Sequence, residues 1–279
     1  MKFAVGITVY YPKYEQVEKI KSYVDCFDMV MVVDNTENKD YYSKEISEIS
    51  DIEYYAENNV GLPKAFNKMI QNARKEKIDF LCILDQDSDL EKQSIYDIKG
   101  VINGLSNFND FGIIAPKAIC EKNNHQCKEG ISRENWVISS GSFLNLKVLE
   151  QSRIKYDENY FVDRCDADFC KQIINNNLNI LVCNNIILKQ KLGEVNRRGY
   201  LEHSVSRNYY MFRDRLYFNK KFYSQPKRFL LNVLQVLKHY FSIIMYEEKK
   251  MSKIMISIKA FKDYKNKVIG RVAHSNKMD

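Results

Sequence analysis

The sequence predicts an α/β fold in which short apolar strands alternate with amphipathic helices. Apolar runs and stretches of helical periodicity follow one another through the first 85 residues. The second run, 28–35, is apolar throughout its interior, which is typical of a parallel strand covered on both faces. The order therefore indicates right-handed crossovers and a sheet whose first half is parallel.

The predicted elements of the first half follow in regular order. Apolar residues recur at helical spacing after the first strand, and Pro63 suits the first turn of a later helix that carries Ala65, Phe66 and Met69. The predicted strands are 3–10, 28–35, 51–56 and 78–84.

Beyond residue 110 the pattern is looser, and no internal repeat or Gly/Pro-rich linker is visible. A helix is predicted within 160–174. Further strands are predicted for 111–116, 136–146 and 178–188. The charge composition changes near residue 216, so we expect one domain over 1–215 and a helical, basic region over 216–279.

The composition is that of a globular protein, with 45% hydrophobic and 13% aromatic residues in a chain of 279. Seven cysteines at irregular spacings, with no CxxC, give no disulfide framework. The amino terminus leads straight into a strand-like run and shows no signal peptide. We therefore expect a protein of the reducing cytosol.

The net charge of +7 belongs to the carboxy-terminal region. Leu216–Asp279 contains fourteen Lys and Arg against four Asp and Glu. No nucleic-acid-binding module accompanies this charge, so a nucleic-acid partner is not expected. The apolar residues of 229–245 are too interrupted to predict a membrane span. They predict either a helix packed on the domain or an interfacial helix on an anionic membrane.

Three polar clusters fall at the carboxyl ends of predicted strands. They are Thr8 to Tyr10, Asp34 with Asn35, and Asp85-Gln86-Asp87. Ligands of open α/β sheets bind beyond the carboxyl ends of the strands, so the shared position is more informative than any one cluster.

Asp85 and Asp87 are two carboxylates spaced to share a hard divalent cation. An Asx-turn on a solvated loop is the alternative. Asp89 is expected to act as a helix cap or first-turn acid instead of a ligand. The sequence has neither a GxxxxGK[ST] nor a GxGxxG motif, and its four histidines form no HxxH pattern, so P-loop, dinucleotide and zinc sites are not predicted.

A second acidic cluster contains Asp163, Asp166 and Asp168. These residues either favour the positive end of the predicted helix or include a general base that faces the same cleft. Asp34 has a similar pair of interpretations, as a turn residue or as a contact for a nucleotide.

Six segments in order resemble the motifs of bacterial family 2 glycosyltransferases, especially their rhamnosyltransferase-like branch. The resemblance covers residues 3 to about 215. The segments are GITVYYP, VVDNTEN, NNVGLPKAFNKMI, LCILDQDS, SSGSFLNLKVL and YDENYFVDRCDADFCKQ.

This resemblance implies a GT-A fold, a Rossmann-like mixed sheet flanked by helices, with the helical basic region after it. It implies an inverting, metal-dependent transfer from a nucleotide-sugar donor to a glycan or lipid-linked glycan, as in capsule or O-antigen synthesis. The enzyme would lie in the cytoplasm, peripheral at the inner face of the bacterial membrane. dTDP-rhamnose is the favoured donor, with UDP-hexoses and UDP-galactofuranose as alternatives.

The resemblance also implies residue roles. Asp166 would be the catalytic base, with Asp163 as its rival. Mn²⁺ or Mg²⁺ would be held by Asp85 and Asp87. The acceptor side would contain Ser140, Gly141 and Asp168. The donor would contact Thr8, Tyr10, Asp34, Asn59, Gly61, Asn67, Asp85, Gln86 and Asp87.

One departure concerns the metal. Gln190 stands where the family usually has a histidine ligand, and His203 lies too far along the chain to replace it. Two alternatives remain at this point. A degenerate transferase could serve as a partner-binding subunit, and a HAD-type phosphatase would also place DxD after a buried strand.

Overall fold

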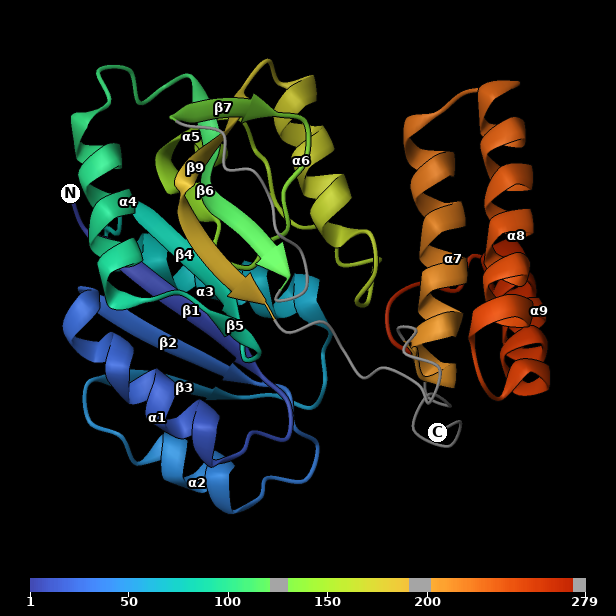
Figure 1. Ribbon diagram of the computed structural model, residues 1–279, viewed down its shortest axis with the longest axis horizontal. Helices are drawn as coiled ribbons and strands as arrows, with labels where there is room; N and C mark the ends of the chain where they lie inside the picture. Colours follow the sequence, from blue (N-terminus) through green and yellow to red (C-terminus); the bar gives the residue numbers. More distant parts are fainter. Residues whose placement is uncertain (121–129, 191–201, 273–279) are drawn as a thin grey trace. The chain divides into compact units, whose positions relative to one another are not determined.

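The computed structural model describes residues 1–120, 130–190 and 202–272 (Figure 1). The chain forms two compact units. The first contains Met1–Tyr156 and Asp166–Lys191, and the second contains Asp157–Cys165 and Leu192–Asp279.

The described residues of the first unit form a nine-stranded mixed sheet. Its parallel half has the order β3-β2-β1-β4, and the path continues through β8, β6, β9 and β5, with β7 beside β9. β8 is antiparallel to β4 and β6, whereas β6 and β9 are parallel. The strands are β1 Phe3–Val9, β2 Met29–Asp34, β3 Ile52–Ala56, β4 Phe80–Asp85, β5 Ser88–Asp89, β6 Phe111–Cys120, β7 Ile131–Glu134, β8 Phe143–Asn145 and β9 Asn179–Gln190.

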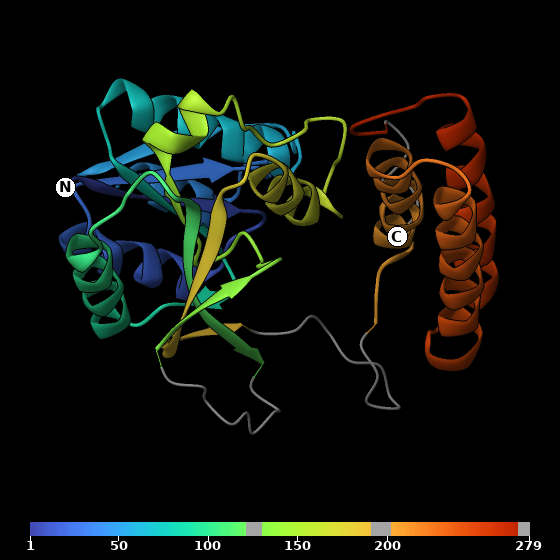
Figure 2. The same cartoon turned by 90° about the horizontal axis from the view of Figure 1, so that it is seen from above.

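Helices cover both faces of this sheet (Figure 2). On one face, Val5 and Ile7 belong to the same buried cluster as Ile20 of α1 and Ile98 of α4. On the other face, α3 approaches β1 so closely that a Cβ on Gly6 would lie 2.5 Å from the Met69 sulfur. The helices of this unit are α1 Tyr14–Tyr23, α2 Tyr41–Ser47, α3 Leu62–Lys75, α4 Lys92–Gly104, α5 Leu146–Gln151 and α6 Cys165–Asn175, with a 3-10 turn at Val24–Cys26.

The second unit is helical, with α7 Val205–Phe222, α8 Lys227–Tyr246 and α9 Lys250–Lys265. Its core contains Tyr209, Phe212 and Leu216 of α7 together with Ile256 and Ala260 of α9. α8 is the one helix among the described residues that is long and apolar enough to cross a membrane by length and composition, and it is mostly exposed. The sequence had suggested that this stretch was too interrupted to span.

The predicted α/β order of the first half is confirmed, with four parallel strands and helices between them. The strand predicted for 136–146 shrinks to β8, because Gly141 adopts a φ of 78° that no strand residue can share. The boundary expected near residue 216 falls inside α7, and the two units divide near residue 192 instead.

Candidate active site

The ends of three neighbouring strands bring the predicted polar clusters to one edge of the sheet. In the parallel register Thr8 lies opposite Asp85, and Val9 lies opposite Asp34. The Thr8 hydroxyl donates a hydrogen bond to Asp85 Oδ1 at 3.3 Å. Thr8 and Asp85 are 77 positions apart in the chain but adjacent in the structure, as expected for residues at the ends of neighbouring strands.

Gln86 joins the segments that leave β1 and β4. Its amide oxygen accepts a hydrogen bond from the Tyr10 N–H at 2.8 Å, and its amide nitrogen donates to the Tyr10 carbonyl at 3.1 Å. The side chain between the two acids therefore bonds to backbone, and the ring of Tyr10 is exposed.

Ser140 supports the turn that carries Asp85 and Asp87. Its hydroxyl oxygen accepts from the Asp85 N–H at 3.0 Å and donates to the Ser88 hydroxyl at 2.7 Å. Asp85 is half-buried and Asp87 is exposed. Ser140 was predicted to face the acceptor, and the structure gives it a role in shaping the acidic turn.

Gly141 fixes the path of the same segment. Its N–H donates to the carbonyl of Ile83 at 2.7 Å. Its φ is 78°, and a Cβ there would lie 2.9 Å from Leu188 Cδ2 and 3.1 Å from Pro116 Cγ. Only glycine combines this conformation with so close an approach.

Gln190 lies beside the acidic turn, because the β5–β9 ladder places it opposite Ser88, directly after Asp87. Asp89 is not a helix cap, since α4 begins after Glu91. Asp89 instead pairs with Lys19 at 3.4 Å.

Asp85, Asp87 and Gln190 offer two carboxylates and a nearby carboxamide. All three groups have the oxygen ligands that a hard divalent cation prefers. No group of three or more His, Cys, Asp or Glu side chains in the described parts of the chain is placed to hold a metal ion. Oxygens of a bound diphosphate and of water would therefore have to complete the coordination of a cation at Asp85 and Asp87.

Asp34 is fully buried. One carboxylate oxygen accepts from the Thr36 N–H at 2.8 Å, and the other accepts from the Tyr54 hydroxyl at 2.7 Å. Burial alone would raise the pKa of Asp34, but such hydrogen bonds outweigh it and hold the pKa below its ordinary value. Asp34 thus orders the turn after β2 as an ionised group, and its contact with a nucleobase stays a prediction.

The residues of the NNVGLPKAFNKMI segment that were predicted to contact the donor bond to different parts of the chain. Asn59 donates to Glu37 Oε1 at 3.0 Å, and Gly61 is the N-cap of α3. Asn67 bonds in both directions to the backbone of Tyr156, at 2.9 and 3.0 Å. Its amide therefore connects α3 to the segment before Asp157, and its contact with the donor stays a prediction.

Asp166 lies in the first turn of α6, half-buried. Its Oδ1 accepts a hydrogen bond from the Ser139 hydroxyl at 2.6 Å, and Ser139 lies 3.0 Å from the Tyr156 hydroxyl. The Tyr156 ring stacks on Phe169, with centroids 4.0 Å apart. A bonded, packed chain of side chains therefore orients the predicted base.

The other two acids of this cluster have different environments. Asp168 is fully buried, and its Oδ1 accepts from Gln172 at 2.5 Å, so contact with an acceptor would require it to become exposed. Asp163 belongs to the second unit and pairs with Arg215 at 3.3 Å and Arg164 at 3.8 Å. Asp163 is therefore held by two guanidinium groups of the second unit, whereas Asp166 accepts from a neutral hydroxyl in the first unit.

Sequence reasoning missed three residues of this site. Ser139 and Tyr156 orient Asp166, and Lys39 donates to the carbonyl of Asp34 at 3.0 Å. The run of small polar residues at 139–142 was a visible signal for Ser139. Tyr156 is the first residue of the segment YDENYFVDRCDADFCKQ, but no role was predicted for it, and nothing separated Lys39 from the many other lysines.

A cavity of ≈ 10 Å³ lies beside Asp85 and Gln86, lined also by Gln16 and Lys19, and it could hold at most one water. This cavity is therefore too small for a nucleotide sugar.

No protein-family model matches the sequence, and no curated protein matches it either. Solved structures of TarS from S. aureus are nonetheless similar. TarS 1–349 in complex with UDP-GlcNAc has a TM-score of 0.59 at 14% identity, over 96% of this chain and 82% of that one. The complex with UDP has a TM-score of 0.57 at 15% identity, over 95% and 81%. A longer TarS chain gives 0.57 at 14% identity, over 100% of this chain and 50% of its own.

The fold is that of a GT-A glycosyltransferase. The expected mixed sheet flanked by helices is thus confirmed. At this level of identity the likeness concerns the fold alone, and it does not favour the rhamnosyltransferase-like branch.

Proposed function

We propose that the protein is an inverting glycosyltransferase that moves a sugar from a nucleoside-diphosphate donor to a hydroxyl group of a cell-surface glycan. One observation carries the proposal. In a GT-A fold, Thr8, Asp34 and the Asp85–Asp87 turn meet at the carboxyl edge of the parallel strands, where such sheets bind ligands.

In this proposal Asp166 takes the proton from the acceptor hydroxyl while the hydroxyl oxygen bonds to the anomeric carbon. The bond from that carbon to the diphosphate oxygen breaks on the opposite side. Ser139 holds the Asp166 carboxylate by its 2.6 Å hydrogen bond, so the base needs little reorganisation.

Asp85 and Asp87, with the Gln190 carbonyl as a third ligand, would hold Mn²⁺ or Mg²⁺ against the donor diphosphate. The bound cation would stabilise the negative charge that develops on the leaving nucleoside diphosphate. The mutual repulsion of the two clustered carboxylates would then be relieved when the site is filled.

Several nucleoside-diphosphate sugars are candidates for the donor. The sequence motifs favour dTDP-rhamnose, with UDP-hexoses or UDP-galactofuranose as alternatives. The TarS structures that share the fold contain UDP-GlcNAc or UDP, so uridine donors join the test on equal terms.

The test is nucleoside diphosphate release from a panel of sugar nucleotides, with Mn²⁺, Mg²⁺ or EDTA. Native protein is compared with Asp87→Asn and with Asp25→Asn, the same change at an aspartate whose side chain is 84% exposed. We expect release from one donor that is lost with EDTA and in Asp87→Asn but is kept in Asp25→Asn. Asp166→Asn should abolish transfer, whereas Asp163→Asn should retain it.

Other outcomes would contradict parts of the proposal. Turnover that ignores EDTA and Asp87→Asn would contradict the metal role of the acidic turn. Orthophosphate release from phosphate esters would indicate a phosphatase. Absence of both turnover and donor binding would indicate a partner-binding subunit.

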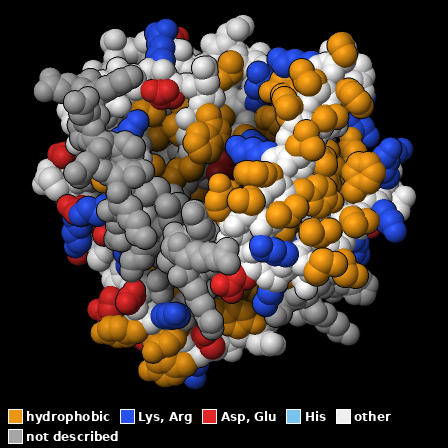
Figure 3. Space-filling model, turned by 45° about the vertical axis from the view of Figure 1, so that its right-hand side comes forward, with side chains coloured by type: hydrophobic (Ala, Val, Ile, Leu, Met, Phe, Trp, Pro, Cys, Tyr) orange, Lys and Arg blue, Asp and Glu red, His pale blue; other side chains and the backbone are white. Residues whose placement is uncertain are grey.

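We further propose that the second unit holds the enzyme on an anionic membrane at the cytoplasmic face, where a lipid-linked acceptor would be available. Apolar side chains are exposed along α8 and α9, with lysines and arginines around them (Figure 3). α8 presents Phe229, Leu230, Val233, Leu234, Leu237, Phe241, Ile244 and Met245, and α9 presents Met251, Met255, Ile258 and Phe261.

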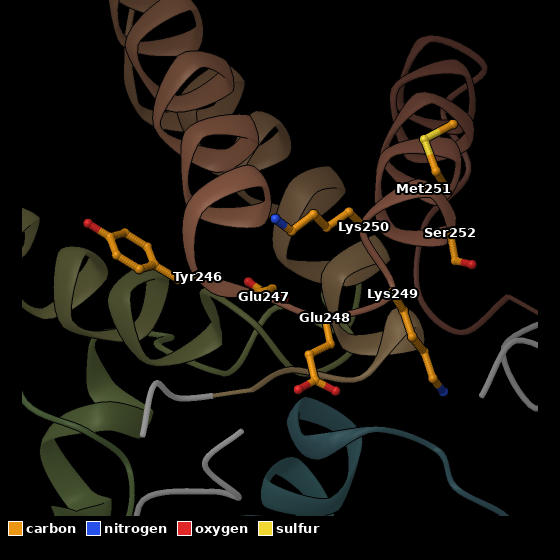
Figure 4. Close-up of a pocket in the computed structure, with 7 residues that line it drawn as sticks. All are labelled: Tyr246, Glu247, Glu248, Lys249, Lys250, Met251 and Ser252. Atoms are coloured by element: carbon orange, nitrogen blue, oxygen red, sulfur yellow. The ribbon is translucent and has the colours of Figure 1, made fainter. Parts of the chain in front are cut away.

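The turn between α8 and α9, at one end of this surface, carries Glu247 and Glu248 as well as Lys249 and Lys250, so its formal charges balance (Figure 4). It encloses a hollow of ≈ 530 Å³ lined by residues 246–252. Lys250 crosses the turn and donates to the carbonyl of Ile244 at 2.5 Å. Lys238, in the middle of α8, and the packing of this helix against α7 and α9 favour a helix that lies in the membrane interface over one that spans it.

Co-sedimentation of the full chain with vesicles tests this placement. We expect binding to phosphatidylglycerol vesicles, weak binding to neutral vesicles, and loss of binding in a Leu230→Asp, Leu237→Asp double variant. Tyr41→Asp is the control, because Tyr41 of the first unit is 73% exposed. Equal sedimentation of the double variant and this control would refute the placement.

A further inference from the structure

The second unit contains a hollow of ≈ 610 Å³ between α7 and α8. Residues at helical spacing on each helix line it, with Met211, Arg215 and Asn219 on α7. On α8 the lining residues include Leu231, Leu234, Gln235, Lys238 and Ser242. Arg164, from the segment before α6, completes the cationic part of the wall.

The hollow has more positive than negative charge. Arg164 and Arg215 share one carboxylate, that of Asp163, at 3.8 and 3.3 Å. Burial is the main reason that the pKa of Arg164 is lowered, and Arg215 lowers it further against the opposing effect of Asp163. Lys238 has no ion-pair partner among the residues that the structure describes.

The remaining titratable groups of the wall do not cancel this charge. Glu247 pairs with the buried Lys253 at 2.8 Å. Burial lowers the pKa of His239 to about 4 and also lowers the pKa of His203, so both rings are neutral at pH 7. Arg164, Arg215 and Lys238 therefore make the electrostatic potential inside the hollow positive.

One side of the hollow is apolar and continues outward. Leu231 and Leu234 of α8 line it together with Met211. Leu234 is also 54% exposed and belongs to the outer apolar surface of α8. A chain that leaves the cationic part of the hollow past Leu234 would reach that surface.

We propose that this hollow binds a phosphate or diphosphate group carried on an apolar chain. Arg164, Arg215 and Lys238 bind the anionic group, because guanidinium and ammonium groups from separate segments converge there. Leu231 and Leu234 contact the beginning of the apolar chain. This inference rests on the proposed function, because the bound group would be the phosphate of a lipid-linked acceptor.

The experiment is calorimetric titration of the full chain with farnesyl diphosphate below its critical micelle concentration. Inorganic pyrophosphate and farnesol are titrated separately. We expect farnesyl diphosphate to bind at least about tenfold more tightly than either, because neither carries both parts of the ligand. Lys238→Gln and Arg215→Gln should each weaken binding roughly tenfold, the usual effect of losing one charged hydrogen bond.

The matched control is Lys262→Gln, at an exposed lysine of α9 outside the hollow. Its affinity should equal that of the native chain. Lys238 is itself exposed, so its replacement tests the proposal even if Arg215→Gln fails to fold.

Three results would overturn the inference. Pyrophosphate binding as tight as that of farnesyl diphosphate would indicate a free anion, and equally tight farnesol binding would indicate a merely apolar surface. Equal affinities of Lys238→Gln and Lys262→Gln would place the ligand elsewhere. The titration contains no nucleotide sugar, so absence of donor turnover would count only against the proposed function.

Discussion

Replacement of Gly141 by alanine should destabilise the first unit and disturb the acidic turn together. Gly141 has a φ of 78°, and its N–H donates to the carbonyl of Ile83 in β4, two residues before Asp85. The added Cβ would lie 2.9 Å from Leu188 Cδ2 and 3.1 Å from Pro116 Cγ. Both neighbours are side chains in the packed sheet, so they can yield only by shifting their own contacts.

The loss of folding stability in Gly141→Ala has two contributions. Placing a non-glycine residue in the left-handed region costs about 1–2 kcal/mol. Inserting a methyl group into a packed core costs about 1–3 kcal/mol. The total of about 2–5 kcal/mol should lower the melting temperature by roughly 4–20 °C for a unit of this size.

The assay is thermal unfolding followed by circular dichroism, with Gly100→Ala as the matched control. Gly100 lies within α4, and a Cβ there would meet no atom within 4 Å. That control should stabilise the protein by about 0.5–1 kcal/mol, because alanine favours helix over glycine. If Gly141→Ala melts as high as the control, the steric argument and the role of 139–142 are both wrong.

Three further predictions concern single side chains. Ser139→Ala should lower the kcat of transfer roughly 10- to 100-fold with an unchanged donor KM, because the base loses a charged hydrogen bond; a matching loss in Ser142→Ala would mean only local damage. Gln190→His should keep or raise metal-dependent donor turnover, and a folded but inactive variant would show that this position is not at the metal. The pKa of His239 is about 4 when folded, against an ordinary value near 6.5. The unfolded chain therefore binds the proton more readily, and stability should be full above pH 6.5 and fall by about 3 kcal/mol toward pH 4. In urea titrations across that range His239→Gln should lose less stability than native protein, and parallel curves would contradict the argument.

Much of the donor edge could be predicted from sequence because strand ends are visible in the apolar pattern. Once β1, β2 and β4 are parallel neighbours, Thr8, Asp34 and Asp85 must lie at the same edge. The orientation of Asp166 could not be predicted in this way. It depends on Ser139, 27 residues earlier, and on a tyrosine ring stacked on Phe169, contacts that follow from packing and not from periodicity.

The domain boundary shows a different limit of sequence reasoning. Charge composition changes near residue 216, but a change in surface charge need not coincide with the end of a packing unit. α7 continues through that point and buries an ion pair, with Arg213 Nη2 2.7 Å from Asp214 Oδ1. The segment 139–142 shows the same limit. Its apolar neighbours predict a strand, but in the structure the positive φ of Gly141 interrupts the extended conformation.

The pair of bonds between Gln86 and the backbone of Tyr10 bears on which substitutions this motif can tolerate. A carboxamide can accept from the N–H and donate to the carbonyl at once, whereas a glutamate at the same position could only accept. In a saturation library, these two backbone bonds alone should therefore lead to recovery of glutamine at position 86. Gln86, between the two aspartates, thus connects the segments that follow β1 and β4, and this structural role is enough to restrict the residue type at position 86.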